Sequence, residues 1–382
     1  MRVAIVTETY LPFTDGVATR LLATLAELAR LRQDVLVLAP DGGPASYAGF
    51  PVVGFPGRPF FVYPDKRVIW PRPRMLGLLR RFHPDVIHTV NPAVFGAGAA
   101  IAAKVLGVPL VASYHTHFAH YARHYGYGAL QRPIWAYMRM LHNQAAINLC
   151  TSAATQEELA RHGFRRLRLW PPGVDTRLFR PVPPDPALRL RFTGGVPGRT
   201  VLLYVGRLAS EKGIERLLPL VREDAGLNLV LVGDGPARAR LQELFAGTPA
   251  VFTGYLHGED LVAAYAAADA FIFPSTTETL GLVVLEALAC GLPVLTARAA
   301  PAAALVGQAG LVYEPRDPAS LADTLHRFRT EPGLRERLAA AARSQRPAAG
   351  WEGPTRTLLA CYEEAMRRAP AGRVQPEPSG GG

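Results

Sequence analysis

Two glutamates, Glu278 and Glu286, flank a run of seven mostly apolar residues and form the most informative polar pair in the sequence. The residues before them, 269–275, are predicted to form a short buried strand that ends at a Pro-Ser break. The residues after them predict a helix that stops at Gly291-Leu292-Pro293. Glu278 is then expected on the loop between strand and helix, and Glu286 about one turn into the helix. Ligands bind at this edge of a parallel sheet.

The start of the same helix is a candidate anion site. The first amide groups of a helix have no internal acceptor, so those from Leu280 through Gly281 to Leu282 would face an anion. Amides for a diphosphate and carboxylates for hydroxyls together suit a sugar nucleotide. The spacing alone leaves open a surface-loop Glu278 followed by an ordinary helical Glu286.

Two cations follow another predicted strand, at residues 201–205. They are Arg207, in Gly206-Arg207, and Lys212, in Lys212-Gly213. Guanidinium and ammonium groups bind phosphate with different geometries, and a pair at one strand end fits neutralisation of a diphosphate. The alternative is a solvated loop.

Two candidate positions lie in the first half of the chain. Gly16 follows the first predicted strand on a loop before a helix, where glycine lets the backbone approach a ligand closely. His115 lies just beyond a later strand, in Ser113-Tyr-His-Thr-His117, and His117 is its less certain neighbour. A simple turn and a packed or surface histidine are the alternatives for these two positions.

The elements that must position these residues alternate between strand and helix in both halves, which predicts α/β domains with parallel sheets. Strands are predicted at residues 3–7, 35–39, 86–89, 110–113 and 146–150, and then at 201–205, 227–232, 251–253, 270–273 and 294–296. Proline-rich residues 181–198 are predicted to link a domain of residues 1–180 to one of residues 199–346. Residues 351–368 predict a helix, and residues 370–382, rich in Pro and Gly, a disordered tail.

Five segments, in order along the chain, resemble retaining glycosyltransferases of the glycogen-synthase-like group 1 family, which use nucleotide sugars. They are Thr7-Glu-Thr-Tyr-Leu-Pro12, Ser113-Tyr-His-Thr-His117, Gly206-Arg-Leu-Ala-Ser-Glu-Lys-Gly213, Val232-Gly-Asp-Gly-Pro236 and the stretch from Ser275 to Val294. The resemblance implies the GT-B fold, in which two Rossmann-like domains face each other across a cleft. It also implies that residues 1–180 bind the acceptor, that residues 199–346 bind the donor, and that the helix at 351–368 crosses back to the first domain.

The resemblance assigns roles to the candidate residues of the second domain. It implies that Arg207 and Lys212 contact the donor phosphates, that Glu286 accepts hydrogen bonds from ribose hydroxyls, and that Glu278 contacts hydroxyls of the transferred sugar.

In the first domain, the resemblance places His115 near the donor sugar, which it would orient rather than deprotonate. The amide of Gly16 would face the donor diphosphate or the acceptor. Many relatives carry paired glycines here, whereas this chain has Asp15-Gly16-Val17, which weakens any role for Asp15.

No metal or other cofactor is expected, because the sequence contains no Asp-x-Asp motif to bridge a metal to the diphosphate. The resemblance implies a hexosyltransferase that retains the anomeric configuration, with the acceptor attacking on the face of the leaving group. A glycosidase that uses the two glutamates is disfavoured, since it has no need for the flanking cations. A noncatalytic nucleotide-sugar-binding protein and a sugar-nucleotide epimerase are the alternatives of other classes.

Within the family, the strongest resemblance is to sulfoquinovosyl and glycosyl transferases that act on diacylglycerol lipids. It rests on the His115 and Glu278 segments together with Leu167-Arg-Leu-Trp170, Gly173-Val-Asp-Thr176 and Pro249-Ala-Val-Phe-Thr-Gly254. This implies a UDP-hexose or UDP-sulfoquinovose donor and a lipid acceptor. A GDP-mannose-dependent α-mannosyltransferase is the main alternative.

The positive charge of the chain lies in its first half. Residues 1–180 contain 21 Lys and Arg against 10 Asp and Glu, whereas residues 181–382 contain 21 of each. Residues 58–82 interleave seven basic residues with Phe60, Phe61, Tyr63 and Trp70, a mixture that favours an anionic membrane surface. A second, more aromatic candidate runs from Tyr121 to Trp135, and solvated arginines are the alternative for both.

Nucleic acid is not an expected partner, because no known binding motif accompanies the charge. Three dispersed cysteines, the absence of a signal-peptide pattern and the absence of a long apolar stretch predict a cytoplasmic protein. With a lipid acceptor, it is expected on the inner face of the plasma membrane.

Overall fold

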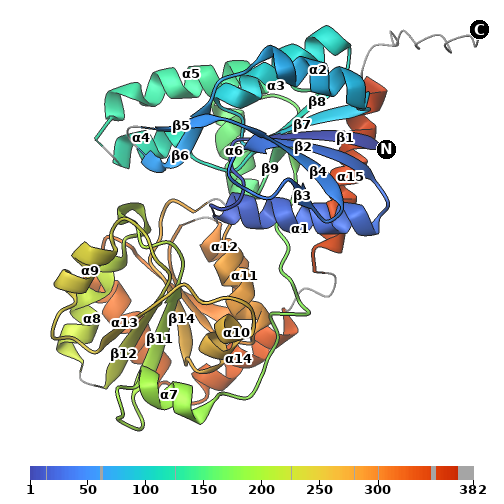
Figure 1. The fold of residues 1–382 in the computed structure, drawn as a ribbon. Coiled ribbons are helices and arrows are strands. Elements are labelled where there is room, and N and C mark those ends of the chain that lie inside the picture. The colour runs from blue at the N-terminus through green and yellow to red at the C-terminus, as the bar shows by residue number, and fades with distance from the viewer. Residues whose placement is uncertain are drawn as a thin grey trace, which may run out of the picture. The chain divides into compact units, whose positions relative to one another are not determined.

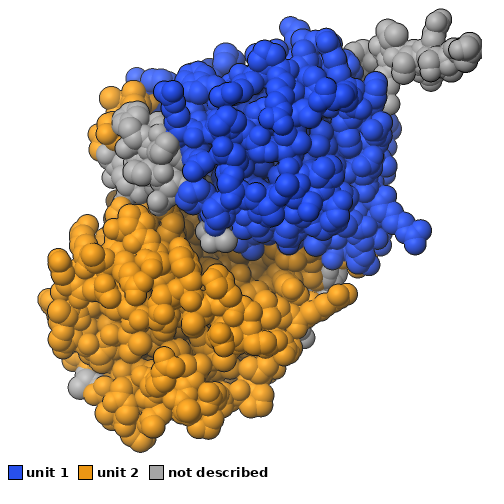
Figure 2. Space-filling model, in the orientation of Figure 1, with its two compact units in different colours: residues 1–116, 132–171, 354–382 blue, residues 117–131, 172–353 orange. Residues whose placement is uncertain are grey.

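The computed structural model describes residues 1–13, 15–60, 63–124, 126–224, 226–278, 280–299, 301–345 and 350–368. The chain divides into two compact units, coloured separately in Figure 2. Unit 1 comprises Met1–Thr116, Arg132–Pro171 and the C-terminal segment from Pro354, and unit 2 comprises His117–Gln131 and Pro172–Gly353.

Unit 1 is built on a largely parallel sheet with the strand order β10-β9-β8-β7-β1-β2-β4-β3 (Figure 1). In chain order the strands are β1 (Arg2–Thr7), β2 (Asp34–Pro40), β3 (Ser46–Tyr47), β4 (Phe50–Phe55), β7 (Val86–Val90), β8 (Leu110–Tyr114), β9 (Ile147–Cys150) and β10 (Leu167–Leu169). Only β3 pairs antiparallel among the described strands of this sheet, and β5 (Gly57–Phe60) and β6 (Tyr63–Ile69) form a separate hairpin. The strands are Val-, Ile- and Leu-rich because both faces of a parallel sheet are covered.

Helices cover the two faces of this sheet and form two hydrophobic clusters. The described helices of unit 1 are α1 (Gly16–Arg30), α2 (Pro73–Phe82), α3 (Val94–Leu106), α5 (Gln131–His142), α6 (Ala153–Arg161) and α15 (Glu352–Arg368). On one face, α1 and α15 pack with alternate residues of β1 and β7, while α2 and α3 pack on the other face (Figure 1). The period of 3.6 residues explains why α1 buries Val17, Leu21, Leu25 and Leu28.

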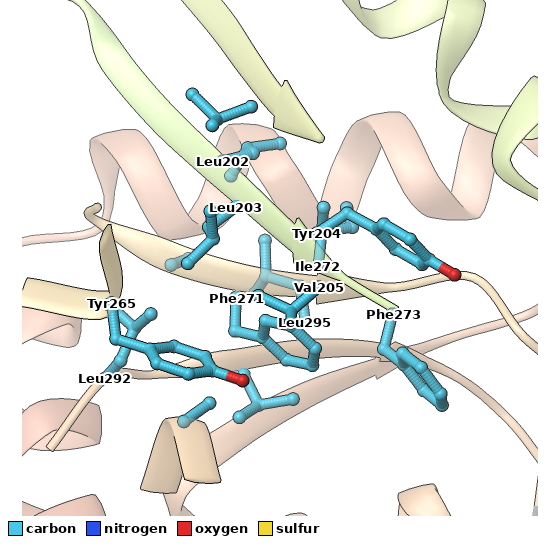
Figure 3. Close-up of a cluster of buried hydrophobic side chains, with 14 of the residues drawn as sticks. Leu202, Leu203, Tyr204, Val205, Tyr265, Phe271, Ile272, Phe273, Leu292 and Leu295 are labelled. Atoms are coloured by element: carbon cyan, nitrogen blue, oxygen red, sulfur yellow. The ribbon is translucent and has the colours of Figure 1, made fainter. Parts of the chain in front are cut away.

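Unit 2 contains a parallel sheet with the strand order β13-β12-β11-β14-β15-β16 (Figure 1). Its strands are β11 (Thr200–Val205), β12 (Leu227–Val232), β13 (Ala250–Gly254), β14 (Ala270–Phe273), β15 (Val294–Ala297) and β16 (Gly310–Tyr313). The core of this unit is one large cluster, and Figure 3 shows side chains of β11, β14 and β15 packed with Tyr265 in it.

Unit 2 also contains helices and 3₁₀ turns, several of which connect its strands. They are α4 (Phe118–His124), α7 (Pro186–Phe192), α8 (Leu218–Glu223), α9 (Arg238–Leu244), α10 (Gly258–Ala266), α11 (Leu282–Ala289), α12 (Ala302–Val306), α13 (Pro318–Thr330) and α14 (Leu334–Ser344), with 3₁₀ turns η1 (Gly128–Leu130), η2 (Ser210–Lys212), η3 (Ile214–Leu217) and η4 (Gly307–Ala309). Among the helices described in either unit, none has the length and apolar character that a membrane crossing requires.

The unit boundaries differ in detail from the domain boundaries expected from the sequence. Unit 2 resumes at Pro172, and the expected linker 181–198 contains α7. The helix expected at 351–368 is α15, which belongs to unit 1 from Pro354 onward. The tail expected at 370–382 lies outside the described residues.

Glycines let the loops after β11 and β12 approach each other backbone to backbone. Gly233 has a φ of 134°, and a Cβ atom there would lie 2.0 Å from the carbonyl oxygen of Gly206. The amide of Leu208 donates to the carbonyl of Asp234 at 2.9 Å, which joins the two loops. A side chain at position 233 would therefore separate them.

Gly233→Ala is expected to lower the stability of unit 2 by at least about 2 kcal/mol, because it combines an unfavourable φ with a backbone clash. Calorimetric thermal unfolding measures the effect. Gly77→Ala, in α2, is the matched control, since a Cβ atom there meets nothing within 4 Å. That control is expected to raise the stability of unit 1 by roughly 0.5–1 kcal/mol. Equal stability of Gly233→Ala and the wild type would contradict the close approach of the loops.

Candidate active site

The candidate residues of unit 2 follow strands that end at one edge of its sheet. Arg207 and Lys212 follow β11, and Glu278 lies on the connection between β14 and α11. Because β11 and β14 pair in parallel, their carboxyl ends lie side by side. The topology therefore brings side chains 66 positions apart in sequence into contact.

Lys212 and Glu278 form an ion pair at this edge. The Lys212 Nζ donates to Glu278 Oε2 at 2.8 Å, and the two side chains are 14% and 18% exposed. Water screens this partly buried ion pair less than it would screen an exposed pair, so the geometry of the pair is better fixed. The contact orients the ammonium group of Lys212 and leaves it within reach of solvent.

Arg207 is held by a second carboxylate on the same loop. Its Nη2 donates to Glu211, whose side chain is fully buried. The backbone around them is fixed as well, because the Tyr204 hydroxyl donates to the Arg207 carbonyl at 3.1 Å and the Thr277 hydroxyl donates to the Glu211 carbonyl at 3.2 Å. Arg207 and Lys212 are thus both cations positioned by carboxylates.

Glu286 lies in the second turn of α11, and the residue is half-buried. The Tyr265 hydroxyl, which extends from α10, donates to Glu286 Oε2 at 3.0 Å. Burial raises the pKa of Glu286 to about 7, and the hydrogen bond from Tyr265 only partly opposes this shift. Tyr265 keeps its proton because burial, and then the charge of Glu286, raise its pKa well above the usual range.

The loop before α11 is shaped by Gly281, which has a φ of 67° in the left-handed region. The helix begins at Leu282, so the anion-binding amides expected at Leu280, Gly281 and Leu282 surround the helix start. The Leu280 amide points back to Glu278 Oε1 at 3.4 Å. The first amide groups of α11 have no acceptor within the helix, so they can bind a ligand.

His115 lies in unit 1, directly after β8, and is only 2% exposed. Its Nε2 is 2.8 Å from the Ser113 hydroxyl, and its ring meets Trp170 edge-on at a centroid distance of 5.7 Å. Burial first, and then the charges of Arg20, His88 and His142, lower the pKa of His115 well below its usual value. The imidazole is therefore neutral at physiological pH.

Gly16, also in unit 1, is the first residue of α1. Its neighbour Asp15 is the N-cap of this helix, and Asp15 Oδ1 accepts from the Ala18 amide at 2.8 Å. The departure of this loop from a paired-glycine pattern thus places a helix cap beside Gly16.

The structure divides the expected site residues between the units. His115 and Gly16 belong to unit 1, whereas Arg207, Lys212, Glu278, Leu280, Gly281, Leu282 and Glu286 belong to unit 2. Within unit 2, direct contacts join Lys212, Glu278 and Leu280. The roles assigned to all nine residues remain predictions.

Four polar residues that hold parts of the structure in place were not singled out from the sequence. Glu211 and Tyr265 each contact a candidate residue, and Glu8 in the first resemblance segment accepts from the Ala93 and Gly96 amides at the start of α3. Arg20 is almost fully buried on the apolar face of α1. A charged residue at a core position of an amphipathic pattern is the one signal that could have revealed it.

The arrangement at the edge of unit 2 suits an anionic ligand that also carries hydroxyl groups. Two cations and the start of α11 can bind phosphate, while Glu278 and Glu286 can accept from hydroxyls. The described carboxylates nearest the cations, Glu211 and Glu278, each already bind one of them. The expectation that no metal takes part remains a prediction.

Two family models match the chain. Residues 14–178 match glycosyltransferase family 4, and residues 189–345 match glycosyl transferases group 1. The second match contains every candidate residue of unit 2.

Two relatives align over most of the chain. A GDP-mannose-dependent alpha-mannosyltransferase of Mycolicibacterium smegmatis is 43% identical over 77% of this chain and 79% of its own length. A sulfoquinovosyl transferase of Arabidopsis thaliana is 35% identical over 90% of this chain and 69% of its own length.

The fold is also similar to that of solved structures. A sucrose-phosphate synthase from Thermosynechococcus elongatus superposes with a TM-score of 0.76 over 96% of this chain and 99% of its own. The sequences are 20% identical, so this likeness concerns the fold alone. It confirms the GT-B fold expected from the sequence.

The raised pKa of Glu286 predicts a pH-dependent stability. Its unfolded carboxyl group titrates near the ordinary 4.5, whereas the folded group titrates near 7. Between these values the folded protein binds a proton that the unfolded chain has released, so stability falls as pH rises through this window. The Glu286→Gln variant has no carboxyl group to titrate at this position. Its free energy of unfolding is therefore expected to rise relative to that of the wild type by up to about 3 kcal/mol between pH 4.5 and pH 7.

Thermal unfolding of both proteins across this pH range measures the gain. Glu243→Gln, an exposed change on α9 in the same unit, serves as the control. A difference between Glu286→Gln and the wild type that stays constant with pH would show that Glu286 titrates normally.

Proposed function

We propose that this hexosyltransferase, which belongs to the group 1 glycosyl transferases, transfers a hexose from a nucleoside diphosphate sugar to a lipid acceptor. The transfer is proposed to retain the anomeric configuration. The observation that carries this proposal is the pair of carboxylate-bound cations at the sheet edge of unit 2, Lys212–Glu278 and Arg207–Glu211. They lie beside the start of α11, within the residues that match the family.

In the proposed reaction, Lys212 and Arg207 bind the two phosphates of the donor. Charge builds up on the leaving diphosphate in the transition state, so cations already held in place stabilise it without reorganisation. In Glu278, Oε2 accepts from Lys212 and Oε1 lies 3.4 Å from the Leu280 amide, and each carboxylate oxygen can accept more than one hydrogen bond. The carboxylate can therefore orient the cation and accept from a sugar hydroxyl at the same time.

Glu286 and His115 are proposed to hold the rest of the donor. The carboxyl group of Glu286 accepts hydrogen bonds from the ribose hydroxyls, while neutral His115 orients the transferred sugar. The acceptor hydroxyl then attacks on the face from which the diphosphate departs. The chemistry proposed here uses no metal and no covalent intermediate on the protein.

Two donors deserve direct comparison. UDP-hexoses, including UDP-sulfoquinovose, are favoured by the segments that resemble sulfoquinovosyl and glycosyl-diacylglycerol transferases. GDP-mannose is favoured by the mannosyltransferase relative, which is 43% identical against 35% for the sulfoquinovosyl transferase. We place GDP-mannose first for testing, which reverses the order suggested by the sequence motifs.

A lipid acceptor requires that the protein reach a membrane surface, and we propose that residues 58–82 make this contact on the cytoplasmic face of the plasma membrane. Arg72, Arg74, Arg80 and Arg81 are exposed on and beside α2, and Trp70 just before them is 65% exposed. Arg67 is less available, because it pairs with Asp41 at 2.6 Å. Phe61 and the side chains of Phe60, Tyr63 and Lys66 lie outside the described part of the structure.

Incubating the pure protein with radiolabelled UDP- and GDP-sugars, with and without diacylglycerol lipids, tests the proposed function. Sugar incorporation into lipid is expected with one donor class, and it should persist in EDTA. Hydrolysis or epimerisation of the donor without lipid labelling would contradict the proposal. Strict dependence on an added divalent ion would contradict its metal-free chemistry.

Lys212→Met is expected to lower kcat by about 10²–10³-fold, because it removes a cation from the leaving diphosphate. The substitution also leaves Glu278 without its cation, so the Lys212→Met/Glu278→Gln double variant is the matched test. It removes the stranded charge and is expected to remain equally impaired. Arg240→Ala, an exposed change on α9, controls for net charge. Wild-type turnover in the double variant would rule out a role for Lys212 in catalysis.

Replacing Arg72, Arg74, Arg80 and Arg81 together by Gln is expected to weaken binding to anionic liposomes at least tenfold. Each basic residue near such a surface contributes about 1 kcal/mol, and salt screens this attraction. Vesicle sedimentation at several salt concentrations measures the binding, while turnover on a detergent-dispersed acceptor should change little.

The control for this experiment carries the same change of charge at exposed positions of unit 2. It replaces Arg191, Arg222, Arg240 and Arg316 by Gln. Equal binding of both quadruple variants would show that the arginines around α2 are ordinary surface residues.

A further inference from the structure

Asn91 follows β7 directly, and its side chain holds the loop that carries His115. The His115 amide donates to Asn91 Oδ1 at 3.3 Å, and Asn91 Nδ2 donates to the Thr116 hydroxyl at 3.0 Å. Asn91 is 3% exposed and His115 is 2% exposed. All three residues belong to unit 1, so these contacts lie within one unit.

The two contacts fix the orientation of the Asn91 amide group. A backbone N–H group can only donate, so the atom that faces the His115 amide must be the side-chain oxygen. The NH2 group then faces Thr116, whose hydroxyl oxygen accepts from it. Because this side chain is buried and both of its polar atoms bind the protein, it is placed to hold the loop and not to touch a substrate.

The side-chain oxygen takes the place of a backbone carbonyl in the ladder between β7 and β8. Val90 pairs with Ser113, and the Asn91 amide donates to the Ser113 carbonyl at 2.8 Å. If both strands continued, the next bond of this parallel ladder would run from the His115 amide to the Asn91 carbonyl. β7 ends here instead, and Asn91 turns with a φ of 53°. Its Oδ1 then accepts from the His115 amide, so the ladder is extended by a side chain.

Asparagine suits this turn for two reasons. The left-handed region is unfavourable for most side chains, but Asn and Asp adopt it more readily than other residues with a side chain. Both also carry an oxygen close to the backbone that can accept from a neighbouring amide. Glycine would adopt the same φ without strain but would leave no acceptor for the loop after β8.

The turn at Asn91 is a firm anchor because α3 begins three residues later and is itself tied down. Glu8 Oε1 accepts from the amides of Ala93 and Gly96 at 2.8 and 2.9 Å. A Cβ atom at Gly96 would lie 2.6 Å from Thr89 Oγ1, so the start of α3 lies close against the end of β7. The place of the turn is therefore set by a strand and a helix, and the loop after β8 is bonded to that turn.

We propose that Asn91 is a positioning residue whose side chain extends the ladder beyond the end of β7 and thereby sets the place of His115. The consequence for catalysis rests on the proposed function, in which His115 orients the transferred sugar. A shift of the loop would misplace the imidazole relative to the sugar and slow the transfer. The placement of His115 itself does not depend on that function.

Hydrogen exchange of single amides, followed by NMR on the full chain, tests the positioning directly. Asn91→Gly keeps the turn and removes the acceptor, so the His115 amide is expected to exchange at least tenfold faster relative to the Val111 amide in β8. The Val111 amide is the reference because a general loss of stability would speed both amides alike. Asn91→Asp keeps an acceptor in the same place and is expected to keep the His115 amide protected.

Arg32→Gly is the matched control, since Arg32 has the same φ of 53° but is exposed. It should leave the ratio of the His115 and Val111 exchange rates unchanged. Thr116→Val removes the hydroxyl that orients the Asn91 amide group, and it is expected to raise the ratio as well. An unchanged ratio in Asn91→Gly would overturn the proposal. Should that variant not fold, an unchanged ratio in Thr116→Val would overturn it.

Kinetics on the same variants separates this proposal from the proposed function. Asn91→Gly is expected to lower kcat about tenfold at an unchanged Kd for the nucleoside diphosphate, whose proposed contacts lie in unit 2. Asn91→Asp and Arg32→Gly should retain most of the wild-type kcat. If the His115 amide loses protection while kcat stays at the wild-type value, the positioning of His115 is confirmed and its role with the sugar is ruled out. A fall in kcat without a change in protection would overturn the positioning.

Discussion

Parallel strand pairing is the constraint on which the arrangement of functional residues depends. In a parallel sheet all carboxyl ends lie at one edge, so loops that are far apart in sequence must meet there. In unit 2 this brings Lys212, after β11, to Glu278, after β14. In unit 1 the same pairing puts His88 and Ser113 on one face of the sheet, where the Ser113 hydroxyl lies within hydrogen-bond distance of both His88 and His115. Parallel pairing therefore positions both the charged residues at the edge of unit 2 and the buried polar residues of unit 1.

The charged groups of both units are held in place before any ligand is present. Lys212 and Arg207 are fixed by carboxylates, and Arg20 is fixed by Trp170 and two carbonyl groups. A charge that is already oriented needs little reorganisation when a reaction develops charge beside it. In unit 1, burial and then the charge of Arg20 keep His88 and His115 neutral.

Much of this fold could be predicted from the sequence where a pattern was local. The strand at 270–273 and the helix near Leu282 follow from an apolar run and its Gly and Pro breaks, and the structure confirms both. The short strand β3 and the separate hairpin of β5 and β6 were not expected, since strands of two to seven residues carry little periodicity. The contact of Tyr362 with His88 spans 274 positions, and nothing in either local sequence indicates it. The position of Arg20 on an apolar helix face could have been noticed in the sequence. Its stacking on the Trp170 ring could not.

A crystal structure of the protein with bound GDP or UDP tests whether the edge of unit 2 holds the donor. We expect the diphosphate at the carboxyl edge of the unit 2 sheet, in contact with Lys212 and Arg207, and the ribose hydroxyls in contact with Glu286. In that complex Lys212 would bridge Glu278 and a phosphate oxygen. A nucleotide bound elsewhere, with the Lys212–Glu278 pair still at 2.8 Å and no phosphate beside it, would contradict the account.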